Sequence, residues 1–326
     1  MKHVARILAL ALAAAVVHAQ GGQSPASPSP QAPPWAYPVA APGAPPPPAD
    51  DGTPKRVPGS SVALTLPQIR DLFNAPDWHP DKHPPAPEVV IHGRKPDVRA
   101  CGYCHYPNGH GRPENSSLAG LPAAYIVQQM ADFKSGARKG SEPKMGPTNA
   151  MIAVGKAATD ADVKAAADYF ASVPYTKWIR VVETDTVPKM TVSAGLFAAI
   201  PGGGTEPLGQ RLIEMAEDVT RSDIRDSASG FVAYVPKGSL KRGEALVTAG
   251  GGTTERCTVC HGQDLRGLGP VPGIAGRSAS YIVRQLFDIK HGSRNGQWSD
   301  LMNAAVMNLT LDDMVAIAAY AASRTP

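Results

Sequence analysis

The sequence predicts an all-α protein made of two copies of one domain, joined by an irregular insert. A five-residue motif, C-x-x-C-H, occurs at 101–105 and again at 257–261. A gapless repeat follows each motif at an offset of 156 residues, which indicates two copies of one structural unit. Apolar residues after each motif recur at helical spacing, as in Ile126, Met130 and Phe133.

Each motif has the pattern that attaches a c-type haem. Two cysteines can form thioether bonds to one porphyrin, and the adjacent histidine can bind the iron through an imidazole nitrogen. We therefore predict two covalent haems with His105 and His261 as proximal ligands. This assignment uses all 4 cysteines of the chain, which are Cys101, Cys104, Cys257 and Cys260.

A C-x-x-C pair can also form a redox disulfide or half of a zinc site. A zinc site shared by both pairs would join halves that lie more than 150 residues apart in the sequence. It would also leave His105 and His261 without a role. A thioredoxin-like disulfide needs a βαβ setting, which neither motif has. Haem attachment is the interpretation that uses every residue type of both motifs.

The N-terminal residues 1–19 are typical of a secretory signal peptide. Lys2 and Arg6 form a basic start, residues 7–17 form an apolar run, and residues 17–19 have the small-residue pattern of a cleavage site. The run is shorter than the roughly 20 residues of a transmembrane helix. We expect export to the periplasm, and an uncleaved anchor is the alternative.

The next segment, residues 20–60, is rich in Pro, Ala, Gly and Ser and includes four consecutive prolines. Such a composition buries little apolar surface and predicts a disordered tether. The first haem domain is expected over 61–173 and starts with a helix near 67–73. That helix is expected to take the place of the one that precedes the second motif. We expect four histidines of this domain to be exposed to solvent: His79, His83, His92 and His110.

A second axial ligand is predicted for each iron. Methionine opposite histidine raises the reduction potential and suits an electron carrier. Each copy ends in a helix that a threonine caps, and these helices superpose at an offset of 151 residues. At that offset Met151 coincides with Met302, each in an expected loop eight residues before the capping threonine. Met151 and Met302 are therefore the predicted ligands, and Met145 and Met307 are the alternatives. Met130 is expected to pack in the core.

An amphipathic helix is also predicted at 239–247, just before the second motif. This order of elements resembles a class I cytochrome c domain: a first helix, the C-x-x-C-H motif, a helix with the repeated pattern and a final capped helix. The two copies in tandem, over about 101–173 and 239–325, resemble the dihaem cytochromes of the cytochrome c4 type. The second domain is thus expected over 239–326.

This resemblance implies further contacts around each haem. The carbonyl of Pro272 should accept a hydrogen bond from His261, and Ser116 stands at the equivalent place in the first copy. Four repeated side chains are candidates for haem propionate contacts, and the alternative is that duplication alone has retained them. They are Tyr125, Arg138, Tyr281 and Arg294.

The insert, residues 174–238, contains neither Cys nor His and is expected to serve packing or docking. Residues 178–184 alternate like a strand, and residues 231–235 could pair with them as a small β-ribbon.

The sequence as a whole predicts a periplasmic dihaem cytochrome that carries single electrons between redox proteins. The alternative is a cytochrome subunit of a dehydrogenase or oxidase complex, with peripheral association to the membrane. A dihaem peroxidase would need an open position on one iron, and two methionine ligands argue against this. The net charge of +4, without runs of like charge, gives no indication of nucleic acid. No catalytic motif indicates a small-molecule substrate.

Overall fold

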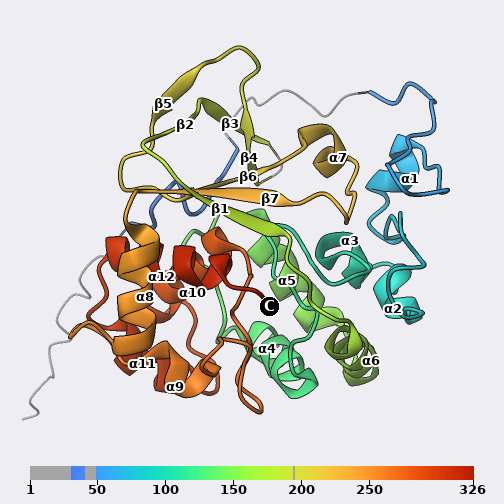
Figure 1. Cartoon of the computed structure of the whole chain (residues 1–326). Coiled ribbons are helices and arrows are strands. Elements are labelled where there is room, and N and C mark those ends of the chain that lie inside the picture. The colour runs from blue at the N-terminus through green and yellow to red at the C-terminus, as the bar shows by residue number, and fades with distance from the viewer. Residues whose placement is uncertain (1–30, 41–48, 194) are drawn as a thin grey trace, which may run out of the picture. The chain divides into compact units, whose positions relative to one another are not determined.

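The computed structural model describes residues 31–40, 49–193 and 195–326 (Figure 1). The predicted signal peptide lies outside the described residues, as do residues 20–30 and 41–48 of the predicted tether. Two helical units follow the two sequence copies, and strands occupy the insert between them in the chain.

The first helical unit is built on the long helices that follow the first motif. Apolar side chains of α4 and α6 share one core, which includes Ile126 and the fully buried Phe170. The last helix starts as predicted, because the Thr159 side chain accepts a hydrogen bond from the backbone N–H of Asp162. The helices of this unit are α1 (Leu66–Arg70), α2 (Glu88–Ile91), α3 (Cys101–His105), α4 (Ala123–Ser135), α5 (Gly146–Ala157) and α6 (Asp160–Ser172).

The second helical unit has the same plan and a longer first helix. Its helices are α8 (Ser239–Ala249), α9 (Cys257–His261), α10 (Ala279–Lys290), α11 (Ser299–Val306) and α12 (Leu311–Ser323). Helices α8 and α12 approach closely at Gly243, where a Cβ atom would lie 2.0 Å from the carbonyl oxygen of Ala316. Within the described residues, no single helix has the length and apolarity to span a membrane. Helices α11 and α12 together have enough length and apolarity to meet these two criteria, but a bend of 115° separates them.

The first helical unit has no equivalent of α8 among the described residues. The helix expected at 67–73 is the short α1, and its buried Ile69 packs with Val57 and Trp78 in a small cluster of its own. The expectation that α1 replaces α8 is therefore wrong. Val89 and Val90 of α2 contribute to the core of the first unit instead.

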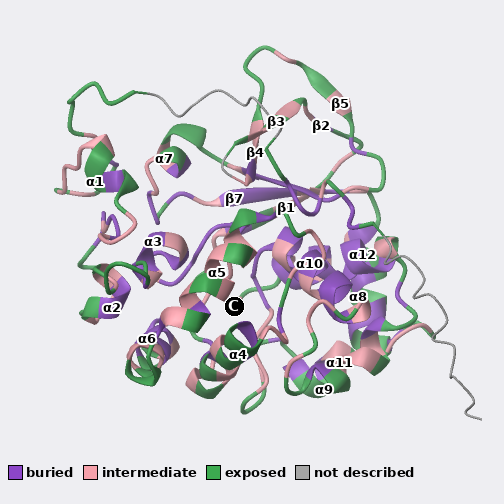
Figure 2. Ribbon diagram, turned by 180° about the vertical axis from the view of Figure 1, so that it is seen from behind, coloured by how far each residue is buried: buried purple, intermediate pink, exposed green. Residues whose placement is uncertain are grey.

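The insert forms more β-structure than predicted, so the all-α fold class is imprecise. Residues 179–183 do pair with residues 231–235, but in parallel and within a five-stranded sheet of order β1-β7-β6-β4-β3. Strand β7 is largely buried near the middle of this sheet (Figure 2). The elements of the insert are β1 (Ile179–Glu183), β2 (Thr186–Pro188), β3 (Met190–Ser193), β4 (Leu196–Ala199), β5 (Thr205–Pro207), β6 (Ile213–Ala216), α7 (Val219–Asp223) and β7 (Phe231–Val235), of which β2 and β5 form a separate pair.

Part of the predicted tether packs against the folded chain, because residues 32–33, 36–38 and 57 are buried. Tyr37 is 2% exposed, and its hydroxyl donates a hydrogen bond to Asp288 Oδ1 at 2.7 Å. Burial also raises the pKa of Tyr37, and Asp288 adds to this effect. Further along, Val57 is buried, and the backbones of Lys55 and Leu64 form an isolated antiparallel β-bridge. The prediction used the average composition of the segment, which is dominated by proline. It therefore missed the single side chains that anchor the segment.

Three of the four histidines expected to be exposed are in fact covered. His79 is buried and bonds Asp226, and the His83 side chain bonds Tyr169. His110 is buried and stacks on Trp178, with 5.0 Å between the ring centroids. Only His92 is exposed. The neighbouring prolines do prevent a helix, as predicted, but partners far along the chain cover these loops.

The burial of His110 predicts a loss of stability in acid. Burial lowers the pKa of His110 to about 4, and the charge of Arg277 acts in the same direction. The unfolded chain binds this proton near pH 6.5, so stability is present above that pH and is lost as the pH falls towards 4. We expect His110 to contribute on the order of 3 kcal/mol to this loss.

Denaturant titrations of the natural protein and of His110→Gln between pH 7 and pH 4 test this expectation. The His110→Gln variant should depend less on pH over this range, whereas the exposed control His92→Gln should follow the natural protein. Equal pH dependence in all three proteins would contradict the prediction.

Candidate haem-binding sites

Each C-x-x-C-H motif forms a one-turn helix that turns its histidine in the same way. In α3, His105 Nδ1 donates a hydrogen bond to the carbonyl oxygen of Ser116 at 2.7 Å. In α9, His261 Nδ1 donates to the carbonyl oxygen of Pro272 at 2.8 Å, which is the bond that the sequence suggested. A carbonyl can only accept, so the proton is on Nδ1 when the imidazole is neutral. This leaves Nε2 of each ring free to bind a metal.

The electrostatic surroundings favour this neutral form. Burial lowers the pKa of His105 and His261, and the hydrogen bond from each Nδ1 opposes this effect. The positive charge of Arg138 lowers the pKa of His105 further, and that of Arg294 does the same for His261. The two sites therefore repeat both the orientation of the histidine and the charge beside it.

The surroundings of Cys101 and Cys257 favour the protonated thiol over the thiolate. Burial raises the pKa of Cys101 to about 12 and that of Cys257 to about 11. A zinc site needs thiolates. Among residues 31–40, 49–193 and 195–326, no group of three or more His, Cys, Asp or Glu side chains is placed to hold a metal ion. The two cysteine pairs thus do not meet in a shared zinc site.

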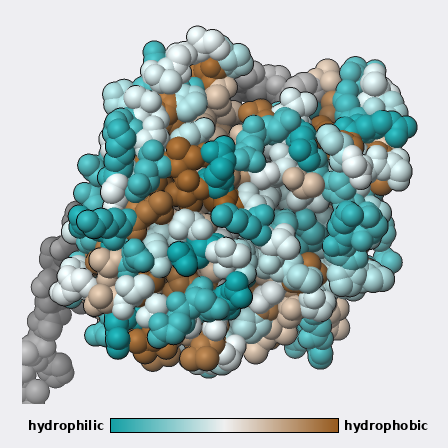
Figure 3. Space-filling model, in the orientation of Figure 1, coloured by the Kyte–Doolittle hydropathy of each residue, from teal (hydrophilic) through white to brown (hydrophobic). Residues whose placement is uncertain are grey.

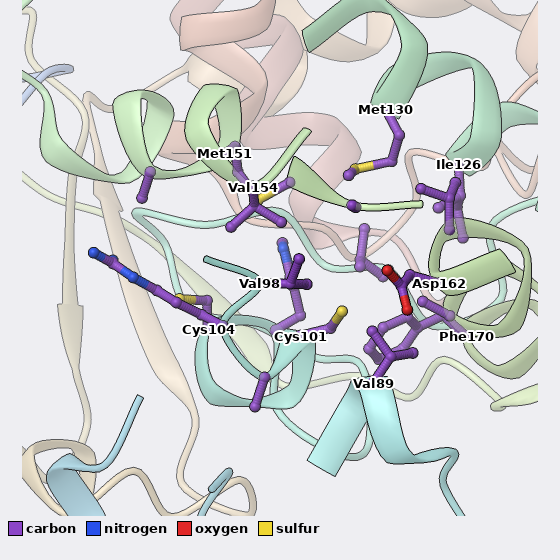
Figure 4. A pocket seen from close by; sticks show the side chains of 18 of the residues that line it. Val89, Val98, Cys101, Cys104, Ile126, Met130, Met151, Val154, Asp162 and Phe170 are labelled. Carbon is purple, nitrogen blue, oxygen red and sulfur yellow. The ribbon is translucent and has the colours of Figure 1, made fainter. Parts of the chain in front are cut away.

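A cavity lies beside the first motif. It encloses about 760 Å³, counting the space open at its mouth. Its walls are mainly apolar. In Figure 4, Met130 and Met151 enter the cavity from the side opposite Cys101 and Cys104. A buried apolar space between two thiols, a histidine and a thioether fits a haem c. Other lining residues include Val89, Val98, Ile126, Val154 and Phe170.

Both predicted methionine ligands lie on helices, so the expected loops are wrong. Met151 is in α5, which begins at Gly146 with Pro147 in its first turn, and Met302 is in α11. The stretch before each capping threonine is thus itself helical. Met151 lines the first cavity. Met302 is partly buried and packs against the core of the second helical unit.

The alternative methionines are placed less well. Met145 is buried in a core made mainly of the second helical unit and is not among the residues that line the first cavity. Met307 is 55% exposed. Met130 does line the first cavity, rather than only packing in the core, but its counterpart in the second copy is Leu286. Only Met151 combines a place on the cavity wall with a methionine in the other copy.

The repeated tyrosines and arginines form one network across the two copies, and all four side chains are buried or half-buried. Each arginine reaches the tyrosine of the other copy: Arg138 donates to Tyr281 Oη at 2.6 Å, and Arg294 to Tyr125 Oη at 3.0 Å. Each also donates to both repeated glutamines, Gln129 and Gln285, at 2.8–3.0 Å. Backbone bonds join the same segments, from Lys139 to Ser293 and from Asn295 to Ala137. In the sequence, the only feature that distinguished the two glutamines was that they coincide when the two copies are aligned.

This network carries positive charge that no carboxylate neutralises directly. In the described part of the chain, neither Arg138 nor Arg294 forms a salt bridge with an acidic side chain. Burial alone would raise the pKa of Tyr281, but Arg138 and Arg294 lower it overall. A second cavity, lined by His105, Tyr125, Arg138 and Tyr281, opens towards this network. Arg138 on the wall of this cavity, with the half-buried Arg294 in the same network, fits the anionic propionates of a haem.

Comparisons with known proteins agree with these features. The family model described as "Cytochrome c" matches residues 94–174. The cytochrome c-554(548) of Halomonas halodenitrificans is 36% identical over 69 residues, which cover 21% of this chain and 83% of that protein. The thiosulfate dehydrogenase electron acceptor of Stutzerimonas stutzeri is 27% identical, over 71% of this chain and 82% of its own. Cytochrome c4 of Azotobacter vinelandii is 26% identical, over 68% of this chain and 82% of its own.

Proposed function

Because this chain belongs to the cytochrome c family, we propose that it carries single electrons between a donor protein and an acceptor protein. The observation that supports this most is the pair of equivalent sites, each with a neutral buried histidine held by a backbone carbonyl. A bound haem c supplies a reversible one-electron change of its iron. Two histidines held in this way support two haems in one chain.

The residues of each site have separate tasks in this proposal. Cys101 and Cys104 would hold one haem covalently, as Cys257 and Cys260 would hold the other. The carbonyls of Ser116 and Pro272 fix the imidazole planes, and Met151 and Met302 would complete the coordination. Saturated irons leave no position for a substrate, which favours a carrier over a peroxidase.

The network of arginine, tyrosine and glutamine would bind propionates and join the two sites. Arg138 and Arg294 each donate hydrogen bonds to residues of both copies, which connects the two sites. Their positive charge would also disfavour the oxidation of a nearby ferrous iron to the ferric state. This effect would raise the reduction potential of that haem. We further propose a periplasmic location, on the basis of the signal pattern in residues 1–19.

A dehydrogenase is the second candidate for the protein's setting. A relative that is aligned over 82% of its length is named as the electron acceptor of thiosulfate dehydrogenase. We propose that this chain likewise accepts electrons from a periplasmic dehydrogenase, either transiently or as its subunit. Purification of the natural protein from membrane and periplasmic fractions should then recover a dehydrogenase activity with it, and a protein that always purifies alone supports the free carrier.

A haem count and a redox titration test the carrier function itself. The purified protein should contain two c-type haems per chain, and an optical titration should require two electrons per chain. The reduced protein should pass its electrons to a one-electron oxidant without turnover of peroxide. One haem per chain, or rapid peroxide-dependent oxidation of a reduced dye, would overturn the proposal.

A further inference from the structure

The two motif helices differ in what covers the residues between their cysteines. Tyr103 in α3 is 8% exposed, whereas its counterpart in the repeat, Val259 in α9, is 56% exposed. Cys104 is half-buried, and its counterpart Cys260 is exposed. Because the motif gives both helices the same local form, the difference comes from other parts of the chain.

Arg225 of the insert covers Tyr103. Its guanidinium carbon lies 3.9 Å from the centre of the Tyr103 ring, and its Nη1 donates a hydrogen bond to the Tyr103 carbonyl oxygen at 2.9 Å. Stacking of a guanidinium on an aromatic ring is favourable where water is excluded. Arg225 has a φ of 60°, which is uncommon for a residue with a side chain. The turn after α7 therefore places this arginine over α3 at some cost in backbone strain.

Trp78 and His79 hold this turn in place through hydrogen bonds. The carboxylate of Asp226 is fully buried and contacts His79 Nε2 at 3.0 Å and Arg221 Nε at 2.7 Å. The indole N–H of Trp78 donates to the carbonyl oxygen of Ile224 at 2.8 Å. We call residues 78–79 and 221–226 together the cap. The second motif has no counterpart of the cap in the sequence, because the repeat does not include the insert.

The surface beside the second motif is open and apolar. Figure 3 shows apolar side chains gathered at the lower edge, over α9 and α11. Exposed charges near this surface have both signs, so its net charge is small. A partner that fits it would present a similar apolar rim rather than a dense patch of one charge. The exposed apolar side chains of these segments are Val259, Leu268, Leu301 and Met307, and the charged ones are Glu255, Arg256, Asp264, Arg266 and Asp300.

We propose that the cap closes the first haem edge to other proteins and leaves the second edge, beside Cys260, as the port for electrons. The partner is a one-electron redox protein with an apolar rim around its own cofactor. In each exchange one electron crosses, the partner is oxidised or reduced by that electron, and no bond forms or breaks. This inference rests on the proposed electron-carrier function. Arg225 acts here as a positioning residue, because it shields the edge and does not touch the iron.

Relaxation of the haem methyl protons by a neutral, water-soluble nitroxide measures this shielding directly in the oxidised dihaem protein. Tyr103→Phe should shift only the signals of the first haem, and Val259→Ala only those of the second, which assigns them. In the natural protein the nitroxide should relax the signals of the second haem several-fold more than those of the first. Equal relaxation of both sets would overturn the proposal.

Arg225→Gly removes the guanidinium while glycine tolerates the positive φ, so the backbone turn can remain. In this variant the relaxation of the first haem should rise several-fold and approach that of the second. Arg266→Ala, which removes an exposed arginine beside the second motif, should leave the first haem unchanged. Unchanged shielding in Arg225→Gly would refute the role of the cap.

Two further measurements keep the test decisive. If circular dichroism shows that Arg225→Gly does not fold, Trp78→Phe loosens the cap through loss of the bond to Ile224 and should give the same rise.

The haem count and redox titration are made first on the natural protein. If they fail, the electron-carrier function fails; if they succeed and the shielding is equal, only the inference about the cap fails.

Discussion

Replacement of Met151 by alanine should remove the charge-transfer band between methionine sulfur and iron for one haem and leave that of the other intact. Met302→Ala should do the same for the other haem. The reduction potential of the affected haem should fall by on the order of a hundred millivolts or more, within the roughly 0.8 V that axial ligands span. The thioether favours the ferrous iron, so its loss favours the ferric state. Near-infrared absorption and spectroelectrochemistry measure both effects.

Matched controls for this prediction come from the neighbouring methionines. Met130→Leu introduces the residue that the second copy has at the same place, Leu286, and should keep both bands. Met307→Leu should also keep both, because this side chain is exposed. Loss of a band in Met130→Leu, together with an intact spectrum in Met151→Ala, would transfer the ligand assignment to Met130.

The largest effect on stability is expected for Gly243→Ala. A Cβ atom at this position would lie 2.0 Å from the carbonyl oxygen of Ala316 and 2.7 Å from the Cβ of Tyr320. Both neighbours belong to α12, and the oxygen is a backbone atom that no side-chain rotation can move. The two helices would have to separate, which typically costs about 1–3 kcal/mol and more where the backbone must shift. Chemical denaturation with haem absorbance and circular dichroism as readouts gives this value.

Gly146→Ala is the control for the intrinsic effect of the substitution. Gly146 is also helical, at the start of α5, and no atom lies within 4 Å of its Cβ position. Alanine there should be neutral or stabilise by up to about 1 kcal/mol, since it has the higher helix propensity. Equal stability of the two variants would mean that α8 and α12 cross less closely than described.

The haem chemistry could be predicted from short motifs and from the repeat. Cys101, Cys104 and His105 lie on one helical turn, so their relative placement depends only on local geometry. The role of Pro272 was implied by the resemblance to class I cytochromes c, whereas the alignment of the two copies paired Met151 with Met302. The resemblance to cytochrome c4 agrees with the relatives found, and two haem c groups per chain follow from it. Even so, the sequence analysis placed both methionines in loops, whereas they lie on helices.

The tertiary structure decided how the copies are joined and which segments cover them. The crossed bonds of Arg138 with Tyr281 and of Arg294 with Tyr125 link residues more than 140 positions apart in the sequence. The same holds for Tyr37 with Asp288 and for His79 with Asp226. Local patterns report propensity and periodicity, whereas such contacts depend on how distant segments fold together. For this reason the sequence by itself predicted the two sites, and only the folded chain showed that one motif is covered and the other is open.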